Sequence, residues 1–198
     1  MEETERIEFD VIGLRETKRR NPLSCTWKHG AGVFLGSRRN KSTFGGIGFI
    51  VAPRLVQNIR RVSGVLDLQL DKKTKVSVIQ IYAPTPDKDE ADHADFYDEV
   101  RETAAKCRSY YKIISGDFNA CVGPKRPYEA LIGPHSLEER NEGEERSASF
   151  CETSHVYHGN SRFRKAENRG GTYVSPNRVH KHELDHILCN RTISWSPQ

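Results

Sequence analysis

The segment from residue 65 to residue 117 constrains the fold of this 198-residue chain more than any other. Its first part predicts a β-hairpin, because Leu66, Leu68 and Leu70 alternate with polar residues and the polar turn DKKTK leads into the β-rich run VSVIQIY. An amphipathic helix is expected next, from about Asp92 to Tyr111, and the short strand KIIS follows it. A hairpin, a helix and a further strand in this order predict an α/β or α+β domain.

Both the face and the ends of the predicted helix support it. Its apolar residues recur at spacings of three and four and form one face: Phe96, Val100, Ala104, Cys107 and Tyr111. Glu90 and Asp92 lie at its start, whereas Lys106 and Arg108 lie at its end, as the helix dipole favours.

Short apolar runs predict the remaining buried strands. They are DVIGL at residues 10–14, two runs at residues 31–35 and 47–51, and ELDHILC at residues 183–189. The polar stretch from residue 121 to 168 is expected to be irregular, with one helix around Arg146–Thr153. With no repeat and no obvious linker, residues 1–198 are predicted to form a single domain.

Composition says more about the cellular location of the protein than about its function. A net charge of +4 and a sequence pI near 8.8 are compatible with a phosphate-rich partner, but they do not argue for one. No apolar run reaches membrane-spanning length, and MEETERIEFD is not a signal peptide, so we expect an intracellular protein, nuclear or cytoplasmic, with no membrane partner. The odd number and wide spacing of the cysteines predict reduced thiols: Cys25, Cys107, Cys121, Cys151 and Cys189. Nothing indicates an oligomeric state.

Three carboxylates lie at or near the ends of predicted strands. Glu16 follows DVIGL, Asp117 follows KIIS, and Asp185 lies within ELDHIL. Rigid strands can direct such acids into one pocket, where they would suit a divalent cation. Taken singly, an acid in such a position is more often a solvated residue at a strand end.

The sequence GDFNA at residues 116–120 favours a shared site. Glycine permits a tight turn, and Asp117 and Asn119, two residues apart, project to the same side of an extended segment. The carboxylate can activate water, and the amide can hydrogen-bond a phosphate oxygen.

GDFNA after a strand is typical of the endonuclease/exonuclease/phosphatase superfamily, which the chain resembles from residue 10 to residue 191. IGLRETK resembles the family segment GLQET, and IYAPTP resembles its YAP segment. GPHSLEERNEGEER is similar to a loop shared by non-LTR retrotransposon nucleases and craniofacial development protein 2-like proteins, and GGTYVSPNRVHKHELDHILCN resembles their TW-SP…NEIDYIL-N segment. Five matches in the family order make these nucleases the nearest resemblance.

The resemblance implies a four-layer α/β sandwich of two mainly antiparallel sheets flanked by helices. It also implies hydrolysis of phosphodiesters by a divalent-metal-dependent DNA endonuclease of retrotransposon type. Glu16 would hold Mg²⁺ or Mn²⁺ together with Asp117, and Asp117 would also orient or deprotonate the attacking water. Asn119 would bind a non-bridging oxygen, Tyr82 would contact the phosphate or leaving group, and Asp185 would orient a catalytic histidine. From the residues alone, Tyr82 is as readily a cap on the core.

The resemblance also suggests a DNA-binding surface. The expected substrate-binding residues are Tyr82, Asn119, Arg140, Asn141, Arg162, Arg164, Thr172 and Tyr173, where Tyr173 stands in place of the family's tryptophan. A basic stretch, formed by Arg162, Arg164, Lys165 and Arg169, would bind backbone phosphates if it borders the cleft.

Two family features have no match, namely a first strand carrying an asparagine and a Ser-Asp-His motif before the last strand. We therefore expect a domain that is incomplete at both ends and a weak or absent nuclease activity. His186 is a poor substitute for the missing histidine, because neighbours on a strand point to opposite faces.

Three other interpretations stay open. One is an inactive remnant or a binding module of the same fold, and another is a phosphatase of another superfamily branch. The sequence also leaves open whether the substrate is DNA, abasic DNA, RNA or a small phosphoester. A zinc module would use two clusters with suitable spacing: Cys151, His155 and His158, and His182, His186 and Cys189.

Overall fold

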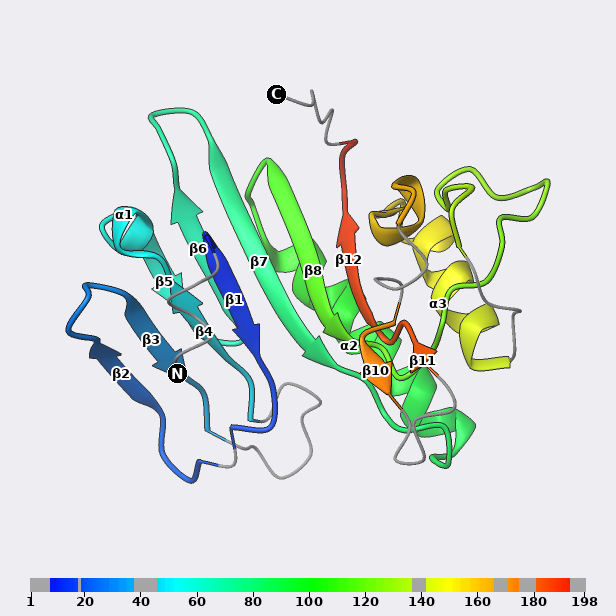
Figure 1. Cartoon of the computed structure of the whole chain (residues 1–198), viewed down its shortest axis with the longest axis horizontal. Coiled ribbons are helices and arrows are strands. Elements are labelled where there is room, and N and C mark those ends of the chain that lie inside the picture. The colour runs from blue at the N-terminus through cyan, green and yellow to red at the C-terminus, as the bar shows by residue number, and fades with distance from the viewer. Residues whose placement is uncertain are drawn as a thin grey trace.

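The computed structural model describes residues 8–17, 19–37, 46–136, 142–165, 171–174 and 181–192. They form two main sheets with helices beside them (Figure 1). The first sheet has the strand order β1-β4-β3-β2 and is entirely antiparallel. Its strands are β1 (Val11–Leu14), β2 (Leu23–Thr26), β3 (Gly32–Leu35) and β4 (Gly48–Val51).

The second sheet has the order β5-β6-β7-β8-β12-β9. Its strands are β5 (Ile59–Val62), β6 (Val65–Gln69), β7 (Lys75–Tyr82), β8 (Tyr111–Asp117), β12 (Asp185–Cys189) and β9 (Tyr157–His158). Only β7 and β8 pair in parallel, because the helix α2 (Glu90–Lys106) carries the chain back between them. The other elements are α1 (Pro53–Val56), α3 (Glu142–Thr153), the 3₁₀ turn η1 (Asn160–Arg162) and a small ribbon of β10 (Tyr173–Val174) and β11 (Lys181–His182).

The alternation of side chains along β7 divides the core into two layers. Val76 and Val78 pack between the sheets with Phe49 of β4, whereas Ile79 and Ile81 face the helices on the other side. That outer layer is closed by aromatic and aliphatic residues of α2 and α3: Phe96, Tyr97, Val100, Ala148 and Phe150. We call the face of the second sheet that points to the first sheet its inner face, and the face covered by the helices its outer face.

The predicted α/β architecture with two mainly antiparallel sheets is confirmed. In the described ranges, α2 and α3 both pack on the outer face of the second sheet. The hairpin at residues 65–82 and the strands at residues 10–14, 31–35, 47–51 and 183–189 are also confirmed, with bounds shifted by one or two residues.

The predicted end of the long helix is wrong. Asp89 caps α2 by accepting a hydrogen bond from the Asp92 amide at 2.8 Å, but Cys107 has an extended backbone and ends the helix. Tyr111 therefore begins β8 and contacts the Tyr110 ring edge to face instead of lying on the helix face.

All five cysteines are free thiols, and four of them are buried, as the sequence predicted. In the part of the chain that the structure describes, no helix has the length and apolar character needed to cross a membrane.

Candidate active site

The strand register aligns three of the predicted site residues in one row. Tyr82 at the end of β7 pairs with Asp117 at the end of β8, and Asp117 pairs with Asp185 at the start of β12. Residues paired in register on adjacent strands point to the same face, and here it is the inner face. This row, which we call the carboxylate row, brings together residues that are more than 100 positions apart in the sequence.

The GDFNA turn gives the row its local shape. Gly116 has φ +143°, and a Cβ atom there would lie 2.0 Å from the Ile81 carbonyl oxygen, so only glycine lets β8 approach β7 this closely. Asn119 has φ +48°, and its backbone amide donates to Asp117 Oδ1 at 2.8 Å. Its side-chain amide donates to the Ala83 carbonyl at 2.7 Å, which fixes Asn119 beside the row.

The first sheet contributes Glu16, which follows β1 and has φ +52°. A Cβ atom on Gly13 would lie 1.9 Å from Gln80 Oε1, so glycine leaves room for the Gln80 side chain against β1 just before Glu16. The Tyr82 hydroxyl donates to Glu16 Oε1 at 3.1 Å. Burial raises the pKa of Tyr82 and the contact with Glu16 raises it further, so the phenol remains a donor at neutral pH.

Arg15 occupies the centre of this group, and sequence reasoning missed it. Its guanidinium forms an ion pair with Asp117 Oδ2 and lies 3.8 Å from Asp185 Oδ1. It also lies 5.9 Å from the centroid of the Tyr82 ring. The signal was present in the sequence, because Val11 packs between the sheets and alternation along β1 places Arg15 on the same side.

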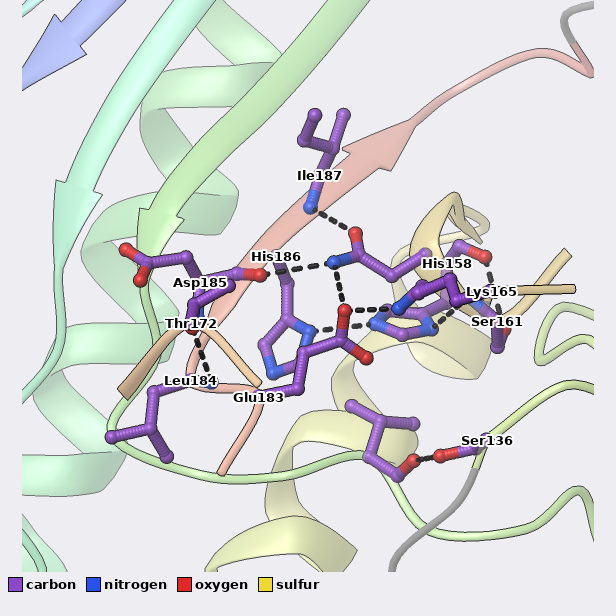
Figure 2. A network of polar contacts seen from close by, with 12 residues as sticks. Ser136, His158, Ser161, Lys165, Thr172, Glu183, Leu184, Asp185, His186 and Ile187 are labelled. Atoms are coloured by element: carbon purple, nitrogen blue, oxygen red, sulfur yellow. Dashed lines mark hydrogen bonds and ion pairs between the residues drawn. The ribbon is translucent and has the colours of Figure 1, made fainter. Parts of the chain in front are cut away.

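On the outer face of the second sheet lies a pair of buried histidines, His158 of β9 and His186 of β12. Figure 2 shows the two rings side by side, with the carboxylate of Asp185 pointing away from them. His186 Nε2 lies 2.7 Å from the Ala120 carbonyl, and His186 Nδ1 lies 3.0 Å from His158 Nε2. The Ser161 amide donates to His158 Nδ1 at 3.2 Å.

These contacts fix the tautomers of both rings. Because a carbonyl only accepts, His186 must donate from Nε2, and its Nδ1 then accepts from His158 Nε2. Both rings are therefore neutral, and burial lowers the pKa of each, that of His158 to well below its usual value. The pair connects η1 to the backbone directly after Asn119, but it does not reach the carboxylate row.

This geometry contradicts the zinc hypothesis. His158 and His186 contact each other directly, and the described residues contain no cluster of three or more His, Cys, Asp or Glu side chains that could hold a metal ion. A structural zinc site needs four such ligands.

The expected DNA-contacting residues have different surroundings. Thr172 accepts hydrogen bonds from the amides of Leu184 and Asp185 at 3.0 and 3.1 Å, so it supports the start of β12. Tyr173 is 41% exposed. Arg140 and Asn141 lie outside the described residues.

Three members of the basic stretch are described, and Arg169 lies outside the described ranges. Lys165 forms an ion pair with Glu183, Arg162 stacks 4.5 Å from the centroid of the Tyr157 ring, and Arg164 is exposed. Arg162 and Lys165 border a hollow of about 270 Å³ that Ile187 also lines. Ile187 lies two residues after Asp185 on β12, so this hollow opens on the same face as the carboxylate row.

The donor chemistry of the row suits a hard divalent cation in part. Mg²⁺ keeps several water ligands and is commonly bound through one or two carboxylates, so it does not need a three-residue cluster. Glu16 is exposed and can supply one of them. Asp117 has only 6% of its side chain exposed, and both of its oxygens are engaged, one by the Asn119 amide and the other by Arg15.

Together, this architecture is the fold of the endonuclease/exonuclease/phosphatase proteins. A solved protein of that family from Leptotrichia buccalis superposes with a TM-score of 0.57 at 12% identity, covering 92% of this chain and 76% of its own. The endonuclease domain of TRAS1, a telomere-specific non-LTR retrotransposon, superposes with a TM-score of 0.52 at 13% identity, covering 81% of this chain and 65% of its own.

In sequence, the chain is similar to craniofacial development protein 2. It is 28% identical to the Bos taurus protein over 204 residues, which cover 96% of this chain and 33% of the relative. The Tragulus javanicus protein matches at the same identity, with 34% of its length covered. The chain thus spans about a third of the length of these curated relatives. No family model matches the sequence.

Proposed function

We propose that the chain hydrolyses phosphodiester bonds in DNA, as an endonuclease of the retrotransposon type that depends on Mg²⁺ or Mn²⁺. The observation that carries the proposal is the carboxylate row, which places Tyr82, Asp117 and Asp185 side by side with Glu16 and Asn119 at its edge. The superposition with the TRAS1 endonuclease domain is consistent with it.

Each side chain has a distinct role in this proposal. Asp117 orients or deprotonates the attacking water, because it is the most buried acid of the row and the Asn119 amide fixes its orientation. Asn119 binds a non-bridging phosphate oxygen, and the Tyr82 hydroxyl contacts the phosphate or the leaving group. Glu16, with Asp117, would hold the divalent cation, which would neutralise charge on the phosphate.

The proposal includes DNA binding by basic side chains beside the row. Arg162 borders the 270 Å³ hollow on the inner face of β12, and Arg162 and the exposed Arg164 would contact backbone phosphates. A larger cavity of about 710 Å³ borders Leu23 and Cys107. Because it includes no member of the row, we do not assign the substrate to that cavity.

A second candidate function is a DNA-binding module that cleaves slowly or not at all. The ion pair between Arg15 and Asp117 favours it, because a carboxylate held by a guanidinium is a weaker base. The surroundings of Asp185 also favour slow cleavage. Its carboxylate faces Arg15, whereas the neighbouring His186 ring is buried on the outer face. We therefore expect a cleavage rate well below that of an efficient nuclease.

The test is nicking of supercoiled plasmid DNA with Mg²⁺, with Mn²⁺ and with EDTA. Slow metal-dependent nicking that Glu16→Gln abolishes supports the nuclease, and Glu102→Gln, an exposed acid on α2, is the matched control. DNA binding with no nicking by the wild-type chain at high protein concentration supports the binding module. If the chain neither nicks nor binds DNA, both proposals are wrong.

A further inference from the structure

The carboxylate row already contains a positive charge from the protein itself. Glu16, Asp117 and Asp185 are three acids, and Arg15 lies against Asp117, near Asp185 and over Tyr82. Asp117 is nearly buried, and a buried carboxylate requires a counter-charge. Arg15 supplies that charge from a different sheet, since β1 and β8 belong to separate sheets.

We infer that Arg15 is a resident counter-cation that competes with the divalent metal ion for Asp117. The inference rests on the proposed metal-dependent function and adds a residue that sets the metal affinity of the same site. The competition concerns one atom, because Asp117 Oδ1 already accepts the Asn119 amide and Oδ2 is the oxygen that Arg15 holds.

Charge determines the direction of the effect. Glu16, Asp117, Asp185 and Arg15 together carry a formal charge of about −2, and loss of Arg15 makes it about −3. Metal entry must also break the ion pair in the wild-type chain, which costs affinity, whereas no such contact opposes entry in Arg15→Gln. We expect Arg15→Gln to bind Mn²⁺ on the order of tenfold more tightly than the wild-type chain.

The experiment is a direct titration of Mn²⁺, following the free ion by electron paramagnetic resonance, with thermal unfolding measured in parallel. Arg15→Lys retains the charge and should bind Mn²⁺ nearly as weakly as the wild type. Arg54→Gln is the matched control, because Arg54 forms an exposed ion pair of 2.9 Å with Asp10 at the other end of β1. Its Mn²⁺ affinity should equal that of the wild type.

Thermal unfolding separates competition from simple tethering of β1 to β8. Under competition, Arg15→Gln melts at a lower temperature without metal, and added Mn²⁺ raises its Tm more than it raises that of the wild type. If Arg15→Gln does not fold without metal, recovery of its circular dichroism spectrum during the Mn²⁺ titration supports competition, and no recovery overturns it.

The remaining outcomes separate this inference from the proposed function. Equal Mn²⁺ affinities of wild type and Arg15→Gln overturn the competition and leave the metal site in place. Failure of both proteins to bind Mn²⁺ overturns the metal-dependent function together with the inference. Binding by Arg15→Gln alone supports the competition in its strongest form.

Discussion

Asp185 and His186 are neighbours in the sequence, yet they belong to two different polar regions on opposite faces of β12. On the inner face, the Asp185 side chain is 41% exposed and faces the charged Arg15. On the outer face, His186 is only 1% exposed and takes part in a chain of neutral hydrogen bonds through His158. One strand therefore carries ionised groups near solvent on one side and uncharged rings in the core on the other.

The contrast separates side chains that can bind ligands, on the inner face, from side chains that stabilise the fold, on the outer face. Charged groups near solvent can exchange partners with a metal ion, water or a phosphate at modest cost. Buried neutral rings with every nitrogen paired cannot, because breaking any contact leaves an unsatisfied polar atom in the core. We therefore expect inner-face changes to alter activity and outer-face changes to alter stability.

The largest expected effect is on activity at the inner face. Asp117→Asn should reduce metal-dependent nicking by about 10²- to 10⁴-fold, because it removes the base while the amide oxygen can still accept from Asn119. Initial nicking rates measure the loss, and circular dichroism checks the fold. Asp98→Asn, at an exposed acid on α2, should leave the rate unchanged. Full activity in Asp117→Asn would remove the carboxylate row from the mechanism.

The next effect is on stability at the outer face. His186→Leu should lower the free energy of unfolding by about 2–4 kcal/mol, because the Ala120 carbonyl and His158 Nε2 both lose their partner. Urea unfolding measures it. The double variant His158→Leu/His186→Leu should lower the free energy of unfolding by less than the sum of the two single variants, because it also removes the ring that a single variant leaves without its partner.

His93 provides the control for that series. It is buried on α2, and its Nε2 has no hydrogen-bond partner among the described residues. His93→Leu should therefore be less costly than His186→Leu. An equal or larger cost would show that the histidine chain stabilises the fold no more than ordinary packing does.

A smaller effect is expected from pH. The folded pKa values of His158 and His186 are lowered, so the unfolded chain binds protons first as the pH falls below about 6.5. The free energy of unfolding is then at its full value above that pH. Below it, the free energy of unfolding decreases by up to about 1.4 kcal/mol per pH unit for each ring that remains neutral in the folded state. Urea unfolding at pH 7.5 and 5.5 measures the decrease, which should be much smaller in His158→Leu/His186→Leu. An equal decrease in both proteins would assign the pH dependence to other groups.

The smallest effect concerns DNA affinity at the basic stretch. Replacing Arg162 and Arg164 by glutamine should weaken binding similarly for all sequences and reduce the slope of log affinity against log salt by roughly 0.9 per lost contact. Fluorescence anisotropy at several salt concentrations measures it. Lys165→Gln should change the slope less, because Lys165 already pairs with Glu183. An unchanged slope in the arginine variants would make them ordinary surface residues.

Most of the second sheet could be predicted from the sequence, but its edge strand β5 could not. The same holds for β2, an edge strand of the first sheet. Alternation in β6 and β7 and the apolar runs of β1, β3 and β4 gave clear signals. β2 (LSCT) and β5 (IRRV) are short, largely exposed strands that depend on pairing with a neighbour, so their own residues predict little.

The candidate site was predictable where one segment carried the information. Glu16, Asp117 and Asn119 follow strands directly, and the structure places them near one another around Tyr82; their roles stay a prediction. The histidine pair was not predictable, because residues 158 and 186 meet only through the pairing of β9 with β12. Alternation along β1 indicates the face on which Arg15 lies, but its contacts with Asp117 and Asp185 cross the two sheets, so its place in the site was overlooked.

The central claim is that the inner face of β7, β8 and β12 is a divalent-metal phosphodiesterase site and the outer face is not. An anomalous difference map from crystals soaked in Mn²⁺ tests it most directly. The account predicts a peak bound by Glu16, beside Asp117 and Tyr82, at the expense of the ion pair between Arg15 and Asp117. A map with no peak at the carboxylate row, or with its peak between His158 and His186, would contradict it.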